Sequence, residues 1–272
     1  YQHVYFASSA DDQVYCLDPE TGDELWRFFA EAPIRLAPTV SLNKLYFGSD
    51  DGYIYCLDIL SGDLVWKRRP GADDRRYPGN GRVISSTPLR TGVIVDKGTV
   101  YFFAGLFPDE GVYCCALDAA TGETRYTQKV DGVSAQGYML ASSSRLFVPT
   151  GRTNPAMFDL ASGKFLGQLA GNGGAYAVLV DNAVVNGPGL ESGRNLTFAD
   201  AESKEGVAQC DGIRMVVDGP IAYIQSKEDL KALDRPKFLE FSKEWNKLNA
   251  QRIDYKKQID KATDKKDLLE AK

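Results

Sequence analysis

Residue types that enzymes use for acid–base and nucleophilic chemistry are scarce in this chain. His3 is the only histidine among 272 residues. A catalytic triad needs a histidine as its base, and a zinc site built on two histidines needs a second one. The sequence therefore excludes both sites, together with most acid–base catalysis by histidine.

Cysteine and aspartate spacing gives no standard metal or haem site. The five cysteines stand at positions 16, 56, 114, 115 and 210, and no C-x-x-C or C-x-x-C-H motif occurs. Zinc ribbons and covalent haem attachment depend on such motifs. Calcium needs six or more converging oxygen donors, which the acidic pairs at 11–12 and 50–51 do not supply alone. We interpret these pairs as hairpin turns.

Five arginines gather in residues 67–82, a stretch that also contains proline, glycine and asparagine. This composition predicts a long loop, and long loops frequently carry binding residues. The arginines could hold an anionic ligand or an acidic partner segment, because guanidinium groups pair with carboxylates and phosphates. Alternatively, they pair with Asp73 and Asp74 in a solvated loop, where each ion pair contributes little. The candidates are Arg68, Arg69, Arg75, Arg76 and Arg82.

The elements that must position these residues repeat along the chain. Residues 14–26 read V-Y-C-L-D-P-E-T-G-D-E-L-W, and residues 54–66 read I-Y-C-L-D-I-L-S-G-D-L-V-W. An aspartate marks each unit, and the successive spacings are 40, 60, 41 and 41 residues. Units near forty residues with short apolar runs are typical of β-propellers. The marker aspartates are Asp18, Asp58, Asp118, Asp159 and Asp200.

Each unit carries the signals of a four-stranded sheet. Two short apolar runs flank an Asp-Asp-Gly turn at 50–52, which indicates a hairpin because glycine tolerates a positive φ. A Ser/Thr-Gly pair predicts the next turn, and a strand led by a proline, Pro38 or Pro88, completes the sheet. A large ring follows each of the first three marker aspartates by eight residues. Packing between units would contribute roughly 2–3 kcal/mol per ring. The rings are Trp26, Trp66 and Tyr126.

The pattern V-Y-x-L-D-x-x-S/T-G-x-x-x-W resembles the tryptophan-docking repeat of the pyrroloquinoline-quinone-like (PQQ-like) propeller superfamily. The resemblance covers about residues 4–235 and is strongest in the first two units. The fifth unit departs from it, with Ser203-Lys204 in place of a Ser/Thr-Gly pair. The resemblance implies an all-β fold, a partial propeller of about five to six four-stranded blades in residues 1–235. A long C-terminal α-helix is expected to follow in residues 236–272.

The resemblance also raises the question of a cofactor. Quinoprotein dehydrogenases of this superfamily hold their quinone against a disulfide between adjacent cysteines, and Cys114 and Cys115 are adjacent. This pair, however, lies in the strand before a marker aspartate, which is expected to pack between blades and away from the central funnel. We therefore predict no cofactor, and PQQ with calcium, in contact with Cys114 and Cys115, is the alternative.

Charge and hydropathy limit the partners. The net charge is −5, and residues 236–272 carry ten basic and seven acidic residues, so the preceding residues carry −8. An acidic propeller does not favour nucleic acid, and no apolar run approaches the length of a membrane span. The chain opens within a strand pattern, so we expect a piece of a longer protein with an incompletely closed ring. The resemblance alone favours a periplasmic or other extracytoplasmic location.

Residues 237–272 contain no glycine or proline, and Pro236 suits a first helical turn. Apolar side chains recur there at heptad spacing, interrupted by Arg252 and Lys266. A helix this long and amphipathic is expected to pack on something. We expect a return helix of the same polypeptide, with residues 236–272 as the first arm of a coiled-coil hairpin inserted in the sixth blade. A second copy and another protein are the alternatives. The expected interaction seam is Phe241, Trp245, Leu248, Tyr255 and Ile259.

Three functions remain compatible with these patterns. We predict a non-catalytic propeller scaffold, or a ligand- or protein-binding module, with the helix as an arm for assembly and no catalytic residues. The first alternative is a PQQ-dependent quinoprotein oxidoreductase, and the second is a cell-envelope assembly propeller. The docking repeat marks the fold and does not distinguish among these functions.

Overall fold

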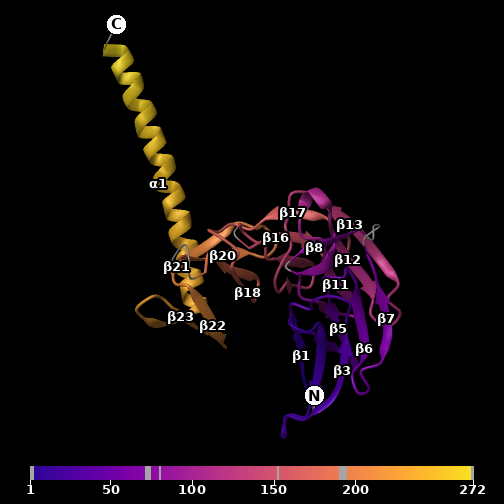
Figure 1. The fold of residues 1–272 in the computed structure, drawn as a ribbon. Coiled ribbons are helices and arrows are strands. Elements are labelled where there is room, and N and C mark those ends of the chain that lie inside the picture. The colour runs from indigo at the N-terminus through magenta and orange to yellow at the C-terminus, as the bar shows by residue number, and fades with distance from the viewer. Residues whose placement is uncertain (1–2, 71–74, 80, 152, 190–194, 271–272) are drawn as a thin grey trace.

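The chain folds into a succession of small antiparallel sheets followed by one long helix. The computed structural model describes residues 3–270 except 71–74, 80, 152 and 190–194, and it describes side chains as far as residue 262. The sheets follow one another along an arc, and the helix projects away from them (Figure 1). Within the described residues, four sheets have four strands, two have three, and one extra hairpin has two.

Strand order within every sheet follows the sequence, so each sheet is an antiparallel meander. The first sheet holds β1 (Val4–Ser8), β2 (Gln13–Leu17) and β3 (Glu24–Phe29), and the second holds β4 (Thr39–Ser41), β5 (Lys44–Gly48), β6 (Ile54–Asp58) and β7 (Leu64–Arg68). The extra hairpin is β8 (Arg76–Gly79) and β9 (Arg82–Ser85). The third sheet holds β10 (Ile94–Asp96), β11 (Thr99–Ala104), β12 (Val112–Asp118) and β13 (Thr124–Val130), with the 3₁₀ helix η1 (Pro108–Glu110) between β11 and β12.

The remaining sheets continue the pattern. The fourth holds β14 (Leu140–Ala141), β15 (Arg145–Val148), β16 (Ala156–Asp159) and β17 (Phe165–Gln168), and the fifth holds β18 (Tyr176–Val180), β19 (Ala183–Gly187), β20 (Asn195–Asp200) and β21 (Gly206–Asp211). The sixth holds β22 (Arg214–Asp218), β23 (Ile221–Gln225) and β24 (Leu230–Asp234), and α1 (Arg235–Glu270) follows directly. The all-β blade prediction and the long C-terminal helix are both confirmed.

Two local expectations were wrong. The arginine-rich stretch is not a long loop throughout, because β8 and β9 pair across four residues each. Pro88 does not open a strand, since the third sheet begins with β10 at Ile94. Instead the backbone N–H of Leu89 donates to the Ser49 carbonyl oxygen at 3.1 Å, and the Leu89 side chain packs on Gly48.

The marker aspartates cap the turns that follow them. The Asp58 carboxylate accepts the backbone N–H groups of Leu60 and Ser61 at 2.9 and 3.1 Å, and the other marker aspartates make equivalent bonds. The glycine of each Ser/Thr-Gly pair then takes a left-handed φ, which is 75° at Gly62. Lys204 adopts the same conformation at 72°, so the fifth unit keeps the turn without the glycine.

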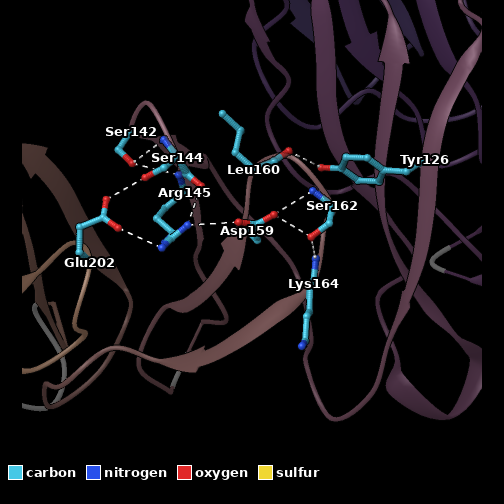
Figure 2. Close-up of polar contacts among 9 residues, drawn as sticks. All are labelled: Tyr126, Ser142, Ser144, Arg145, Asp159, Leu160, Ser162, Lys164 and Glu202. Carbon is cyan, nitrogen blue, oxygen red and sulfur yellow. Dashed lines mark hydrogen bonds and ion pairs between the residues drawn. The ribbon is translucent and has the colours of Figure 1, made fainter.

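A large ring from each of the first three sheets lies against the glycine of the next turn. A Cβ atom added to Gly62 would come within 2.7 Å of the Trp26 ring, and one added to Gly122 within 2.7 Å of Trp66. Each ring also donates to a carbonyl oxygen one residue past the next marker aspartate (Figure 2 shows the third case). These bonds run from Trp26 Nε1 to Ile59 at 3.3 Å, from Trp66 Nε1 to Ala119 at 3.2 Å and from the Tyr126 hydroxyl to Leu160 at 3.1 Å.

Apolar cores lie between consecutive sheets. Each of the five clusters of buried side chains draws on two neighbouring sheets, as where Phe103 of β11 meets Phe158 of β16 with ring centroids 4.9 Å apart. The last core, between the fifth and sixth sheets, also receives Phe238 and Leu239 from α1. Each sheet is therefore stabilised mainly by its neighbours, as in other repeat architectures.

The helix α1 begins at Arg235, one residue before the expected boundary. Asp234 caps it, because its carboxylate accepts the backbone N–H of Lys237 at 3.2 Å. Farther along, the Asn246 side-chain amide donates to the Val207 carbonyl oxygen of β21 at 2.9 Å. The first turns of α1 are thus fixed to the sheets, and the rest of the helix extends beyond them (Figure 1).

Candidate binding surfaces

The structure spreads the five candidate arginines over several protein acceptors. Arg82 pairs with Asp12 and with the Ala10 carbonyl oxygen of the first sheet. Arg76 pairs with Glu31 at 3.5 Å, and Arg75 pairs with Glu110 of η1 at 3.3 Å. The β8–β9 hairpin is therefore tied to the ends of the first and third sheets. Pairing with Asp73 and Asp74, the alternative, lies outside the described residues.

The other two arginines contact different groups again. Arg68 donates to the Thr121 carbonyl oxygen at 3.3 Å, and the Arg69 guanidinium lies 4.4 Å from the Tyr53 ring centroid. The five guanidinium groups thus do not converge on one point. An anion site built from all five has no support in this arrangement, and a role in binding stays a prediction for each arginine.

The adjacent cysteines lie in β12 and are fully buried. Cys114 packs into the core between the third and fourth sheets, and Cys115 packs into the core between the second and third. Their side chains therefore leave opposite faces of the strand, as side chains of successive strand residues do. Burial raises the pKa of Cys114 to about 12 and holds that of Cys115 well above its usual value. Neither thiol offers a surface against which a quinone could stack, so this pair does not fit PQQ.

A charged group that the sequence interpretation missed lies where the β5–β6 turn meets the segments ahead of β4 and β10. Asp50, treated as a turn residue, has no exposed surface and accepts three hydrogen bonds from two arginines. Arg35 Nε lies 2.7 Å from one carboxylate oxygen, and Arg90 binds both oxygens at 3.0 and 3.1 Å. In the structure Arg35 and Arg90 each stand four residues ahead of the first strand of a sheet. Because the sequence pattern predicted that the third sheet opens at Pro88, this shared position could not be detected.

A second arginine cluster serves the contact between sheets. Arg145 bridges Asp159 of its own sheet at 3.2 Å and Glu202 of the fifth sheet at 3.0 Å (Figure 2). Ser144 donates to the other Glu202 oxygen at 2.8 Å. These groups lie at the β14–β15 turn and the end of β16 in the fourth sheet, and at the β20–β21 turn in the fifth. We interpret this cluster as structural.

The predicted helix seam is exposed along its full length. Trp245 has 63% of its surface exposed and Leu248 has 55%, although both are large apolar side chains. A groove of about 770 Å³ runs between this part of α1 and strand β21, with Val207 and Ala208 on the strand side. A second hollow continues along the helix past Leu248. The complete seam, with every member exposed, is Phe241, Trp245, Leu248, Tyr255 and Ile259.

Metal and membrane sites find no support in the described part of the chain. Its histidine, cysteine, aspartate and glutamate side chains form no group of three or more that could hold a metal ion. Among the residues described, no helix combines the length and apolar character needed to cross a membrane.

Comparison with known proteins agrees with the blade geometry. Residues 2–79 match the family model described as outer membrane protein assembly factor BamB. The crystal structure of BamB from Moraxella catarrhalis superposes with a TM-score of 0.59 at 16% sequence identity, covering 86% of this chain and 73% of that one. The chain has the fold of a PQQ-like β-propeller.

Enzymes share this PQQ-like propeller fold. Quinohemoprotein alcohol dehydrogenase from Comamonas testosteroni superposes with a TM-score of 0.59 at 14% identity, and ADHIIG from Pseudomonas putida HK5 with 0.60 at 14%. This chain spans only 42% and 41% of their lengths. A search of curated protein sequences gives no match. At these sequence identities the similarity to the solved structures shows the fold alone. The function of this chain must therefore be inferred from its own surfaces.

Proposed function

We propose that this chain is a non-catalytic propeller scaffold that assembles with a protein partner through the exposed seam of α1. The seam carries the proposal, because five large apolar side chains at heptad spacing face solvent beside a groove. Apolar surface of this extent on a folded protein marks an interaction site. The match of residues 2–79 to a model of an outer-membrane assembly factor supports assembly as the role, and the cell envelope, on its periplasmic side, as the place.

The groove suits an amphipathic helix. Its lining includes Trp245 and Leu248 of α1 and Val207 of β21. Heptad spacing on α1 presents knobs at intervals of three and four residues, which a second helix of the same spacing accepts. The partner segment is therefore a helix with its own apolar seam, supplied by another protein. A return helix of this polypeptide is the alternative.

Arg252 decides between a second copy and a different helix. It stands in the seam line between Leu248 and Tyr255 and lines the same hollow. Two copies pairing in parallel and in register would place Arg252 against Arg252, and like charges face to face are destabilising. A partner with an acidic residue at the facing position would pair with it instead. We therefore propose a different helix that is acidic opposite Arg252, in preference to a parallel pair of copies.

A quinone-dependent oxidoreductase is not proposed. Its candidate contacts, Cys114 and Cys115, are buried on opposite faces of β12. A direct check on this choice is dye-linked oxidation of alcohols by the full chain with added PQQ and Ca²⁺. Turnover above the protein-free background would return the enzyme to consideration.

Binding of designed helical peptides to the full chain tests the seam. One 28-residue labelled peptide carries a leucine heptad seam with glutamate at the position facing Arg252, and its twin carries lysine there. We expect fluorescence anisotropy to show about five- to tenfold tighter binding of the glutamate peptide, since a charge pair at a partly buried seam contributes about 1 kcal/mol or more. Arg252→Glu should reverse the preference.

Matched substitutions on the two faces of α1 serve as controls. Tyr255→Lys places a charge in the seam and should weaken the glutamate peptide at least thirtyfold, because buried aromatic anchors dominate helix docking. Ala250→Lys adds the same charge on the opposite face, where it should change the affinity less than twofold. Equal binding by both peptides, or equal effects of the two lysines, would overturn the proposal. A mass that doubles with protein concentration in light scattering would assign the seam to a second copy.

A further inference from the structure

A cleft of about 550 Å³ opens where the connections between sheets meet. Its lining comes from the segments ahead of β4, β10, β14 and β18, from the first residues of β18, and from the turn between β15 and β16. Four sheets therefore contribute to one hollow. We call it the central cleft, and the residues that define it here are Arg35, Leu36, Arg90, Tyr138, Pro149 and Tyr176. This volume lies within the range of small-molecule sites.

Two arginines give the central cleft a positive charge. Arg35 and Arg90 share one carboxylate, that of Asp50, which is buried. No acidic residue stands among the described residues that line the cleft. Arg35 uses only Nε for Asp50, and Arg90 uses Nε and one Nη. The remaining Nη groups make no other bond in the described chain. One net positive charge and several free donors therefore face the cleft.

Asp50 fixes both guanidinium groups in place. Its backbone is also held, because its N–H donates to the Pro33 carbonyl oxygen at 2.9 Å and its own carbonyl oxygen accepts from Ser85 N–H at 2.8 Å. A guanidinium that is oriented before binding loses little conformational entropy when a ligand arrives. The donors are thus pre-organised for a planar acceptor such as a carboxylate, which guanidinium groups bind through parallel hydrogen bonds.

The rest of the lining is mainly apolar. Leu36 and Pro149 contribute hydrocarbon, Tyr138 and Tyr176 contribute rings, and the Gln136 side chain and the glycine backbones are its polar groups. The Tyr138 hydroxyl accepts from Ala37 N–H at 3.0 Å, and the Tyr176 hydroxyl accepts from Met215 N–H at 3.1 Å. An inorganic anion would gain less from this lining than a carboxylate carried on an apolar body.

We propose that the central cleft binds a carboxylate carried on an apolar or aromatic body, with Arg35 and Arg90 as the carboxylate contacts. Two sources offer this chemistry, a small organic acid and an acidic side chain flanked by apolar residues in a peptide. The site is independent of α1 and of the partner proposed for it. Its failure and the failure of the seam would therefore be seen in separate experiments.

The test follows the Nε–Hε signals of Arg35 and Arg90 in the ¹⁵N-labelled full chain during titration with benzoate. Bonding to buried Asp50 should protect these protons from exchange and make both signals visible. We expect saturable shifts of both signals with a millimolar Kd, and at least tenfold weaker binding of benzamide, which has the same body without the charge. Unshifted signals at 50 mM benzoate, or equal binding of benzamide or inorganic phosphate, would overturn the proposal.

Substitution of Arg90 is not a clean control, because it leaves the buried Asp50 carboxylate with one partner. Ala175→Glu is preferable, since Ala175 is exposed and lines the cleft, and a resident carboxylate there should weaken benzoate at least tenfold. The matched variant is Ala161→Glu, at an exposed turn position where the first unit already has Glu20, and it should leave the affinity unchanged. Equal affinities of these two variants would contradict the assignment.

A peptide arm separates the two sources of the carboxylate. The acetylated and amidated tripeptide Phe-Glu-Phe is titrated beside benzoate, with Phe-Gln-Phe as its uncharged control. Tighter binding of Phe-Glu-Phe than of benzoate supports a protein segment as the occupant, and the reverse order supports a small organic acid. Equal binding of Phe-Glu-Phe and Phe-Gln-Phe would count against the carboxylate contact itself.

Discussion

At the scale of single residues, one set of contacts is repeated between sheets. A marker aspartate caps a turn, the turn glycine takes a left-handed φ, and the ring of the preceding sheet lies on that glycine. At the third unit these residues are Asp118, Gly122 and Trp66. The same turn supplies the carbonyl oxygen, on Ala119, that accepts the indole N–H. Turn geometry and inter-sheet packing are therefore one feature, and altering the turn must alter both.

Two glycines of similar left-handed conformation separate backbone strain from ring packing. Gly22 and Gly122 have φ of 77° and 70°, but only Gly122 lies under a ring, since nothing approaches within 4 Å of a Cβ at Gly22. We expect Gly22→Ala to lower the free energy of unfolding by about 1 kcal/mol through the left-handed backbone alone. Gly122→Ala should cost about 1–3 kcal/mol more, because its Cβ must displace Trp66. Urea unfolding followed by tryptophan fluorescence measures both, and equal losses would disprove ring packing on Gly122.

The marker aspartates also predict how stability responds to acid. The Arg125 side chain, and then the Thr121 backbone N–H, lower the pKa of Asp118 to about 2. An unfolded aspartate has a pKa near 3.9, so the folded chain binds fewer protons between these values. Asp118 therefore stabilises the fold fully above about pH 4, and this contribution is lost as the pH falls toward 2.

Asp118→Asn isolates this contribution, because asparagine keeps an oxygen acceptor but cannot ionise. We expect the variant to be less stable than the parent at pH 6 and to approach it in stability by about pH 2. Arg125→Gln removes the largest cause of the lowered Asp118 pKa. In this variant the acid-induced loss of stability should therefore occur at higher pH than in the parent. Urea titrations at several pH values check both, and a difference between parent and Asp118→Asn that stays constant with pH would contradict the assignment.

At the scale of elements, the sequence predicted those features that depend on local chemistry. The strand–turn–strand order of the first five units follows from turn residues close to the strands that they join, and the helix follows from the composition after Pro236. Predictions from local chemistry were wrong where tertiary contacts determine the secondary structure. The hairpin β8–β9 lies in a stretch rich in turn residues, and it is fixed by pairs such as Arg82 with Asp12, 70 positions apart.

The central cleft shows the same limit for a candidate site. Arg35, Asp50 and Arg90 converge only because successive sheets bring their connections to one place. In the sequence each one reads as an ordinary turn or connection residue. The seam of α1 could be predicted from the sequence, since heptad spacing is a property of one continuous segment. The fifth unit shows that the turn can form without its glycine. Asp200 accepts two backbone N–H groups there, and Lys204 adopts the left-handed φ in place of glycine.

At the scale of the whole molecule, the sheets differ in how much support they receive. Every residue of β11, in the third sheet, is buried, and cores pack on both faces of that sheet. In the sixth sheet, β23 alternates between buried and more exposed positions. Its apolar cluster lies against the fifth sheet and the first turns of α1. In a linear array of repeats, stability is the sum of each unit and its contacts with neighbours. The described sheets should therefore open separately rather than all at once.

Hydrogen exchange at β11 and β23 compares the two sheets. Both strands are paired on both sides, but β11 pairs with β10 only through Thr99, Val100 and Tyr101, whereas β23 pairs over its full length with β22 and β24. Ladder bonding alone would therefore not protect β11 more than β23. Burial of β11 between two neighbours means that its amides exchange only when the central sheets separate, whereas β23 is released by opening at one interface. We expect native-state exchange followed by mass spectrometry to give rates at least a hundredfold slower for β11 than for β23. Equal protection at the two strands, with exchange rates that rise together in low urea, would instead show a single cooperative unit. Contacts between the sixth sheet, α1 and β21 would then be as strong as those within the central sheets.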